Sequence, residues 1–180
     1  MHIVLYIIPM KIKFLSVLVL VLFYSCNKKQ ENSELTVVKV DDSLLIKEKD
    51  IAKLKYTDYI LDERTEDVIL NWTEYSKLQD VVSKVKKGDL SFFNNNNKTI
   101  EDLLKNLKQA IPLEVNTESI LARITALETK IYKLESLYKL STTKKPELLE
   151  LTKEFLVAFS NLNLQMNKKL EGDSIIIEKP

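Results

Sequence analysis

The 180-residue chain has nearly balanced charge, with 27 Lys and Arg residues against 26 Asp and Glu residues and a net charge of +1. Nucleic-acid binding needs a basic surface that releases phosphate counterions, and no such excess is present, so we expect no nucleic acid as a partner. The single histidine is His2 and the single cysteine is Cys26. This scarcity excludes His-based catalytic triads and the zinc, haem and iron–sulfur sites that need these ligands, so we expect no metal and no cofactor.

A short basic stretch and an apolar run precede Cys26. Lys11 and Lys13 are followed by a mainly apolar run over residues 14–24 and then by Ser25. These are the parts of an export signal, and the stretch resembles a bacterial lipoprotein signal. The resemblance implies that the residues before the cysteine are removed and that the Cys26 thiol is acylated.

The residues around the expected cut define the signal more closely. The resemblance implies cleavage after Phe23, Tyr24 and Ser25, of which only Ser25 fits the strict lipoprotein pattern. Looser patterns occur in lipoproteins of Bacteroidota-type envelopes. Met10, directly before the basic stretch, is a more natural translation start than the first residue of the chain. We therefore expect residues 1–25 of the given sequence to be the signal-peptide region, and we expect Met10 to be the true translation start, in which case the signal peptide itself is residues 10–25.

Two other interpretations of the leader are open. One is a membrane-spanning helix, but residues 14–24 would span only about 17 Å at 1.5 Å per residue, against roughly 30 Å of hydrocarbon. The other is an ordinary secretory signal in which Cys26 is a plain apolar residue. Because two or three acyl chains anchor a protein stably, we expect a protein of the cell envelope, lipid-anchored to a membrane and facing the periplasm or the cell surface.

Residues 26–44 are expected to form the acylated cysteine and a flexible tether. They are mostly polar, and a random coil of about 17 residues spans roughly 20 to 25 Å on average. The β-branched run over residues 36–40 could instead pack on the domain as an extended segment. Removal of residues 1–25 takes away two lysines and no acid, which leaves 25 basic against 26 acidic residues.

Residues 45–180 are expected to form one helical domain that begins with a long helix over residues 45–87. Only two glycines and four prolines occur in the chain, which favours long helices. Apolar residues recur at helical spacing and predict a buried stripe of Ile51, Leu54, Leu61, Val68, Trp72, Tyr75, Val82 and Val85. Gly88 is the expected stop. A helix of this length would be about 60 Å long, longer than the helices expected after it. The first part of the long helix must therefore overhang the bundle or break, and a bend is expected in residues 62–67.

A loop over residues 89–98 carries Phe92 and Phe93. One of these side chains could dock the loop onto the bundle, or the pair could form a partner-binding tip. A short helix is expected to start at Thr99, where Asp102 three residues on resembles a capping box, and to run to about residue 110.

Two helices with matching apolar seams follow. The seam of the first is spaced alternately by four and three residues, which is typical of a coiled-coil contact. Its members are Ile120, Ile124, Leu127, Ile131, Leu134 and Tyr138. The second helix, with Pro146 in its first turn, has one seam of Leu148, Phe155, Phe159, Leu162 and Met166 and another of Leu149, Leu156 and Leu170.

A turn of about five residues joins these helices, which predicts an antiparallel helical hairpin. Gly172 is expected to close the second helix, and the three isoleucines of the tail, residues 173–180, are expected to fold back onto the long helix. The predicted fold is therefore all-α: an antiparallel helical bundle of one long helix, one short helix and a C-terminal helical hairpin.

Few residues qualify as candidate sites. Trp72 and Tyr75, three residues apart on a helix, could flank a groove for an apolar ligand or pack in the core. Ser43 and Ser174 each follow an aspartate and precede an apolar residue, which resembles the O-glycosylation acceptor of Bacteroidota envelopes. Adjacent carboxylates lack the glycine and the alternating ligands of a calcium loop, so we expect them to form solvated helix faces. We identify no catalytic residue.

Residues 88–93, reading Gly-Asp-Leu-Ser-Phe-Phe, and residues 116–128 carry a wider resemblance together with the leader. On these stretches the whole chain resembles the small helix-rich lipoproteins of Bacteroidota-type (flavobacterial) envelopes. The resemblance implies no particular activity.

We expect a non-enzymatic envelope protein whose bundle binds a protein partner, either another envelope protein or a second copy of itself. The alternative is a carrier of an apolar small molecule in a pocket between the helices. The first function predicts an exposed apolar patch of several hundred Å², and the second predicts an enclosed pocket of at least about 300 Å³.

Overall fold

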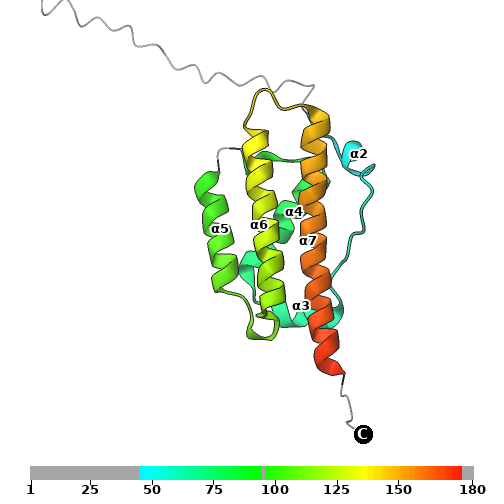
Figure 1. The fold of residues 1–180 in the computed structure, drawn as a ribbon, viewed down its shortest axis with the longest axis vertical. Coiled ribbons are helices and arrows are strands. Elements are labelled where there is room, and N and C mark those ends of the chain that lie inside the picture. Colours follow the sequence, from blue (N-terminus) through cyan, green and yellow to red (C-terminus); the bar gives the residue numbers. More distant parts are fainter. Residues whose placement is uncertain (1–44, 95, 176–180) are drawn as a thin grey trace, which may run out of the picture. The chain divides into compact units, whose positions relative to one another are not determined.

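Helices form all the regular secondary structure in residues 45–94 and 96–175, the part of the chain that the computed structural model describes. Figure 1 shows how they are arranged. In chain order they are α2 (Glu48–Ile51), α3 (Glu63–Ile69), α4 (Thr73–Lys86), the 3₁₀ turn η1 (Ser91–Phe93), α5 (Asn97–Gln109), the 3₁₀ turn η2 (Leu113–Val115), α6 (Glu118–Tyr138) and α7 (Lys145–Ser174). This confirms the predicted all-α helical bundle.

The α6–α7 hairpin forms the centre of the bundle (Figure 1). The hydroxyl of Thr117 accepts a hydrogen bond from the Ile120 amide at 3.4 Å and caps the start of α6. Pro146 lies in the first turn of α7, where a missing amide proton costs nothing. The predicted seams pack against one another, and all but two of their members are buried; Tyr138 and Leu149 are half-buried. The hairpin prediction is confirmed.

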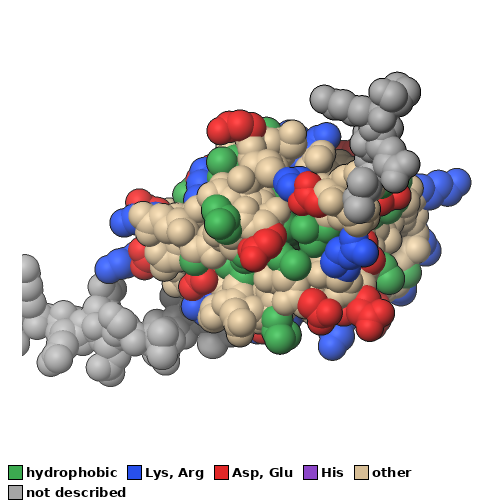
Figure 2. Space-filling model, turned by 90° about the horizontal axis from the view of Figure 1, so that it is seen from below, with side chains coloured by type: hydrophobic (Ala, Val, Ile, Leu, Met, Phe, Trp, Pro, Cys, Tyr) green, Lys and Arg blue, Asp and Glu red, His purple; other side chains and the backbone are tan. Residues whose placement is uncertain are grey.

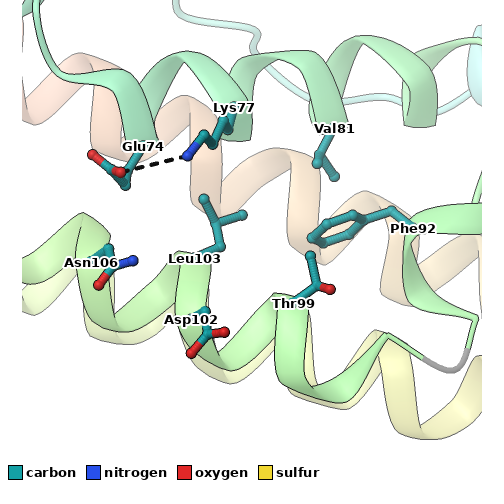
Figure 3. Close-up of a pocket in the computed structure, with 8 residues that line it drawn as sticks. All are labelled: Glu74, Lys77, Val81, Phe92, Thr99, Asp102, Leu103 and Asn106. Carbon is teal, nitrogen blue, oxygen red and sulfur yellow. Dashed lines mark ion pairs between the residues drawn. The ribbon is translucent and has the colours of Figure 1, made fainter.

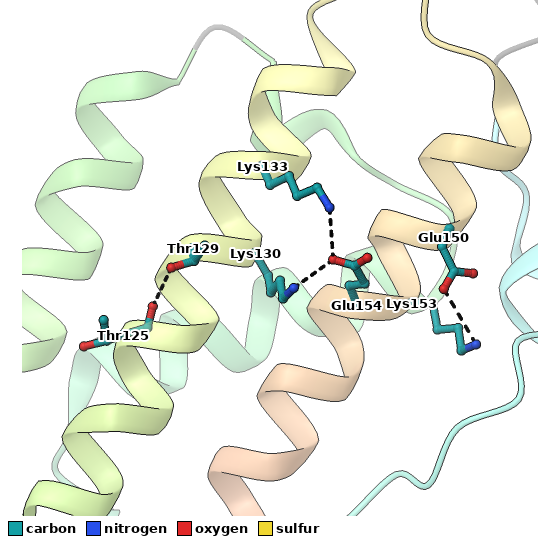
Figure 4. Close-up of polar contacts among 7 residues, drawn as sticks. All are labelled: Thr125, Thr129, Lys130, Lys133, Glu150, Lys153 and Glu154. Atoms are coloured by element: carbon teal, nitrogen blue, oxygen red, sulfur yellow. Dashed lines mark hydrogen bonds and ion pairs between the residues drawn. The ribbon is translucent and has the colours of Figure 1, made fainter.

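A polar edge also joins the two helices of the hairpin (Figure 4). The ammonium groups of Lys130 and Lys133 on α6 lie 2.9 and 3.4 Å from the same carboxylate oxygen of Glu154 on α7. The hydrogen bond from Lys130 is the main reason that the pKa of Glu154 lies below its usual value, and the positive charge of Lys133 adds to it. Partly exposed pairs of this kind contribute little to stability.

The prediction of one long helix over residues 45–87 is wrong. The chain forms the short α2, then runs without helical structure through residues 52–62, a segment that we call the strap, and then forms α3 and α4. The strap descends beside α7 (Figure 1). Helix α3 begins where a bend was expected, because the Asp62 carboxylate accepts a hydrogen bond from the Thr65 amide at 2.8 Å and acts as its N-cap.

Three polar side chains of α7 explain why the strap is not helical. Ser160, Asn163 and Asn167 lie three and four residues apart, which places them on one face of the helix. Each bonds to the strap backbone: Ser160 to the carbonyl of residue 57 and the amide of residue 59, Asn163 to the carbonyl of residue 59, and Asn167 to the carbonyl of residue 60 and the amide of residue 62. Backbone groups that a helix would satisfy internally are satisfied by α7 instead.

The core contains two aromatic clusters. Tyr75 stacks between Trp72 and Phe159 with ring centroids 5.5 and 5.8 Å away, and its hydroxyl donates to Asn163 Oδ1 at 2.7 Å. Phe93 meets Phe155 edge to face at 5.8 Å. Burial of this size is the main favourable contribution to the fold. Every member of the predicted stripe in residues 51–85 is at least half-buried, although the backbone between them is not one helix.

Gly88 ends α4 as predicted. Its φ of +85° is the left-handed conformation that favours glycine. A Cβ at this position would lie 2.8 Å from the carbonyl oxygen of Ile46. The glycine therefore allows both the end of the helix and the close approach of residues 46–48.

Two predicted helix ends need correction. Helix α5 begins at Asn97, because the amide of Ile100 already bonds to the carbonyl of Asn96 at 2.9 Å; Thr99 lies in the first turn and is not the cap. Helix α7 continues past Gly172 to Ser174, since nothing lies within 4 Å of a Cβ at Gly172 and the helical conformation needs no left-handed residue there.

Candidate functional site

A cleft of about 360 Å³ lies between α4 and α5 and is open to solvent (Figure 3). Its lining comes from α4, from η1 and from α5. The lining residues are Glu74, Lys77, Val81, Phe92, Thr99, Asp102, Leu103 and Asn106. We take it as the candidate binding site because an apolar floor and a polar rim meet in it.

The fold creates this cleft through the turn between the two helices. Helices α4 and α5 run antiparallel and are joined through η1, which sends Phe93 into the core. Phe92 contacts Phe93 edge to face at 5.4 Å and turns toward the space between the helices. With Val81 and Leu103, each less than a tenth exposed, Phe92 gives the cleft an apolar floor.

The rim of the cleft is polar. The carboxylate of Glu74 lies 3.6 Å from the ammonium group of Lys77 one turn later on α4. Thr99, Asp102 and Asn106 line the side that α5 forms, and all three are exposed. A hydroxyl, a carboxylate and an amide around an apolar floor can accept and donate hydrogen bonds while an apolar group sits below them.

Three of the four aromatic residues predicted as interaction candidates lie in the core. Trp72, Tyr75 and Phe93 are each no more than 1% exposed, as the core-packing alternative predicts. Burial raises the pKa of the Tyr75 phenol, and the charge of Glu66 raises it further. Phe92 alone, half-buried, reaches a cleft.

The other predicted site residues are not tested by this structure. Cys26, the cleavage residues 23–25 and Ser43 lie outside the described residues. Ser174 is the last residue of α7; it is exposed, and its hydroxyl donates to the carbonyl of Glu171 at 2.7 Å. Of the tail expected to fold back, Ile175 is 62% exposed and the remainder, residues 176–180, lies outside the described part.

Most cleft residues could not be found from the sequence. Val81 and Leu103 read as ordinary apolar helix positions, and Asp102 was assigned to a cap that does not form. The only signal was the double phenylalanine in the predicted loop, because exposed neighbouring aromatic side chains mark either an interaction site or a contact with the core.

Two further apolar side chains are exposed near the end of the bundle where α7 terminates, the end that Figure 2 views from below. Leu70 follows α3 and is 74% exposed, and Leu113 in η2 is 85% exposed. Their elements meet at this end because Arg64 of α3 donates to the carbonyl of Leu170 at 3.2 Å and η2 packs on α7. The side chains stand among charged residues.

Residues 45–94 and 96–175 contain no group of three or more His, Cys, Asp or Glu side chains that could hold a metal ion. Among the helices of this same part, none is both long enough and apolar enough to cross a membrane. Comparison with known proteins found no matching family model, no matching curated protein and no matching solved structure. The assignment of a function therefore rests on the residues of the chain itself.

Proposed function

We propose that this chain is a membrane-anchored envelope lipoprotein whose helical bundle is a non-enzymatic protein-interaction module. The leader supports the anchor, because a basic stretch, an apolar run too short to span a bilayer and a small residue precede Cys26. The bundle supports the binding role through the α4–α5 cleft. Its partner is another envelope protein or a second copy of the chain.

The observation that carries the binding role is the combination of an apolar floor with an open polar rim. Phe92, Val81 and Leu103 offer contact area to one inserted apolar side chain. Glu74 and Asp102 bring negative charge to the rim, and Lys77 already lies beside Glu74. The cleft therefore fits an apolar anchor residue flanked by basic or polar groups on a partner helix.

Site-directed photo-crosslinking in intact cells tests this role. A photoreactive amino acid at Asn106, on the rim, is expected to give an adduct of defined mass, whereas the same amino acid at the exposed Ser136 of α6 is expected to give none. The Thr99→Trp substitution, which fills the cleft from an exposed position, should abolish the adduct. Equal crosslinking from Asn106 and Ser136 would remove the cleft as a binding site. An adduct of twice the protein mass identifies a second copy.

A carrier of an apolar small molecule is the second candidate, favoured by the volume of the same cleft. About 360 Å³ exceeds the roughly 300 Å³ that a small ligand needs. Because the cleft is open rather than enclosed, an apolar ligand would keep part of its surface in water, which favours the partner model. Saturable binding of an apolar fluorescent dye that Thr99→Trp abolishes would support the carrier, and binding that Thr99→Trp leaves unchanged would not.

Metabolic labelling with a radioactive fatty acid tests the anchor. We expect label on the wild-type protein and none on the Cys26→Ala variant. A protein that takes up no label, or a label that survives Cys26→Ala, rules the anchor out while leaving the cleft experiment unaffected.

A further inference from the structure

Four separate segments of the chain meet at the end of the bundle where the described chain begins. We call this the entry end and define it as residues 45–55, 84–89, 97–98 and 139–147. The Lys145 ammonium group lies 3.0 Å from the carbonyl oxygen of Leu45 and 2.7 Å from the carboxylate of Asp50. Gly88 abuts Ile46, and Lys139 bonds to Asn97. These contacts bring all four segments together.

The entry end is strongly basic although the chain as a whole is nearly neutral. Its four segments contain eleven lysines and only four acids, Glu48, Asp50, Asp89 and Glu147. The lysines are Lys47, Lys49, Lys53, Lys55, Lys84, Lys86, Lys87, Lys98, Lys139, Lys144 and Lys145. At the opposite end of α7 the balance is reversed, because residues 62–74, 108–118 and 167–175 contain nine acids and four basic residues. The domain therefore carries a charge gradient along its helices.

Most of these lysines have no structural role that would account for them. Ion pairs with Asp58, Glu135 and Asp50 involve Lys86, Lys139 and Lys145. The other eight make no ion pair within the described residues, and all eight are exposed. Complementing the helix dipole explains the lysines at the end of α4. It does not explain those of residues 47–55, which surround a single helical turn and the start of the strap.

We propose that the entry end docks onto the anionic headgroups of the membrane that holds the lipid anchor. The inference rests on the proposed anchor at Cys26, which lies only 19 residues before Leu45. Nineteen residues reach at most about 65 Å even when fully extended, so an anchor at Cys26 would keep the entry end near the bilayer at high local concentration. Clustered lysines gain attraction to phosphate headgroups within a Debye length, and a lipid chain combined with a basic patch is a stable two-part anchor. Docking turns the acidic end away from the membrane.

Vesicle partitioning of the full chain tests the docking. Binding is measured to vesicles of phosphatidylcholine alone and of phosphatidylcholine mixed with phosphatidylglycerol, at low and high salt. The test variant changes four exposed lysines of the entry end to glutamine: Lys49, Lys53, Lys55 and Lys144. The control variant removes the same charge elsewhere by changing Lys105, Arg123, Lys168 and Lys169 to glutamine.

We expect the wild-type chain to prefer anionic vesicles at low salt. This preference should be at least about tenfold smaller for the test variant, and for the wild-type chain in high salt. For the control variant it should differ from wild type by less than about twofold. The leader contributes equally to all chains, so it cancels from the comparison. Equal losses in the two variants, or no preference for anionic vesicles in the wild-type chain, would overturn the proposal. The same ratio is measured on the full chain carrying Cys26→Ala, so failure of docking is distinct from failure of acylation, which the fatty-acid label reports.

Discussion

The hairpin and the strap are held to the bundle in different ways. Helices α6 and α7 meet through apolar seams, and their backbone hydrogen bonds stay within each helix. The strap instead lies on α7 through its backbone, which Ser160, Asn163 and Asn167 bind, while most of its side chains remain exposed. Burial of side chains secures the first region, whereas satisfaction of backbone groups by one helix face secures the second.

The difference matters for function because the two regions present different surfaces. The hairpin gives a rigid frame, and α4 and α5 build the cleft beside it. The strap connects the basic entry end to α3 at the acidic end, and the Lys86–Asp58 pair at 2.6 Å also ties it to α4. Changes in the hairpin should therefore affect global stability. We call Ser160, Asn163 and Asn167, which bond to the strap backbone, the clamp; changes in the clamp should act first on the strap.

The largest effect is expected from Phe155→Ala in the hairpin. Phe155 is fully buried against Phe93, and removing its ring leaves a cavity in the centre of the core. We expect a loss of about 3–5 kcal/mol in the free energy of unfolding, measured by urea denaturation. The control Leu140→Ala removes an exposed side chain and should change it by less than about 0.5 kcal/mol. Similar values for the two variants would contradict the hairpin as the source of stability.

The next effect is expected from Asn163→Ala in the clamp. The change removes the acceptor of the Tyr75 hydroxyl and the donor to the carbonyl of Tyr59, and both groups are left without their partner. We expect a loss of about 2–3 kcal/mol and faster proteolysis within residues 52–62. Asn161→Ala, on another face of the same helix and outside the clamp, serves as the control. Equal protease resistance of the two variants would show that the strap does not depend on Asn163.

The two glycines should respond to alanine with opposite signs. Gly88→Ala places a Cβ 2.8 Å from the carbonyl oxygen of Ile46 in a left-handed conformation, so we expect a loss of about 1–2 kcal/mol. Gly172→Ala occurs inside α7 with open space around it and should stabilise the protein by about 0.5–1 kcal/mol. Thermal unfolding of both variants measures the difference. Stabilisation by Gly88→Ala would contradict the close approach of residues 46–48.

The smallest effect is expected from Glu154→Gln at the polar edge of the hairpin. Because Lys130 and Lys133 hold the pKa of Glu154 below its usual 4.5, the carboxylate stabilises the fold above that value and loses this contribution as the pH falls through its lowered pKa. The variant should be less stable than wild type by under about 1 kcal/mol at neutral pH. Urea denaturation across the acid range should show the gap closing; a gap that widens in acid would refute this assignment.

The hairpin could be predicted from the sequence because its contacts repeat with the period of the helix. Ile120, Ile124 and Leu127 mark the seam of α6, and Thr117 and Pro146 mark the starts of the two helices. Each of these sequence signals lies within the helix that it predicts, and the apolar seam of α6 packs against the apolar seam of α7. The spacing of apolar residues therefore predicts the helices, their register and their packing together.

The strap could not be predicted because its structure is decided by residues a hundred positions away. Leu54 and Leu61 have the spacing of a helix stripe and do turn toward the core, but Asn163 and Asn167 bind the backbone between them. The sequence of residues 52–62 does not predict this contact with α7. The available signal lay in α7, where the polar residues Ser160, Asn163 and Asn167 share one helix face and the first two are buried.

The candidate cleft could not be predicted from the sequence either, for a related reason. Predicting it requires knowing that α4 and α5 pack as neighbours and that Phe93, rather than Phe92, enters the core. Adjacent identical residues carry no information about which one is buried. The charge gradient, by contrast, depends only on which segments of the chain lie at the same end of the bundle. It can therefore be derived from the sequence once the fold is known.

A distance between spin labels at residues 58 and 86 tests most directly whether the chain folds back so that the strap lies beside the end of α4. The two labels replace Asp58 and Lys86, whose charged groups lie 2.6 Å apart, in a chain carrying Cys26→Ala so that only the introduced thiols react. The strap predicts label distances below about 20 Å, since the two side chains are neighbours. A continuous helix through residues 45–87 would hold them about 42 Å apart at 1.5 Å per residue, and that result would contradict the account.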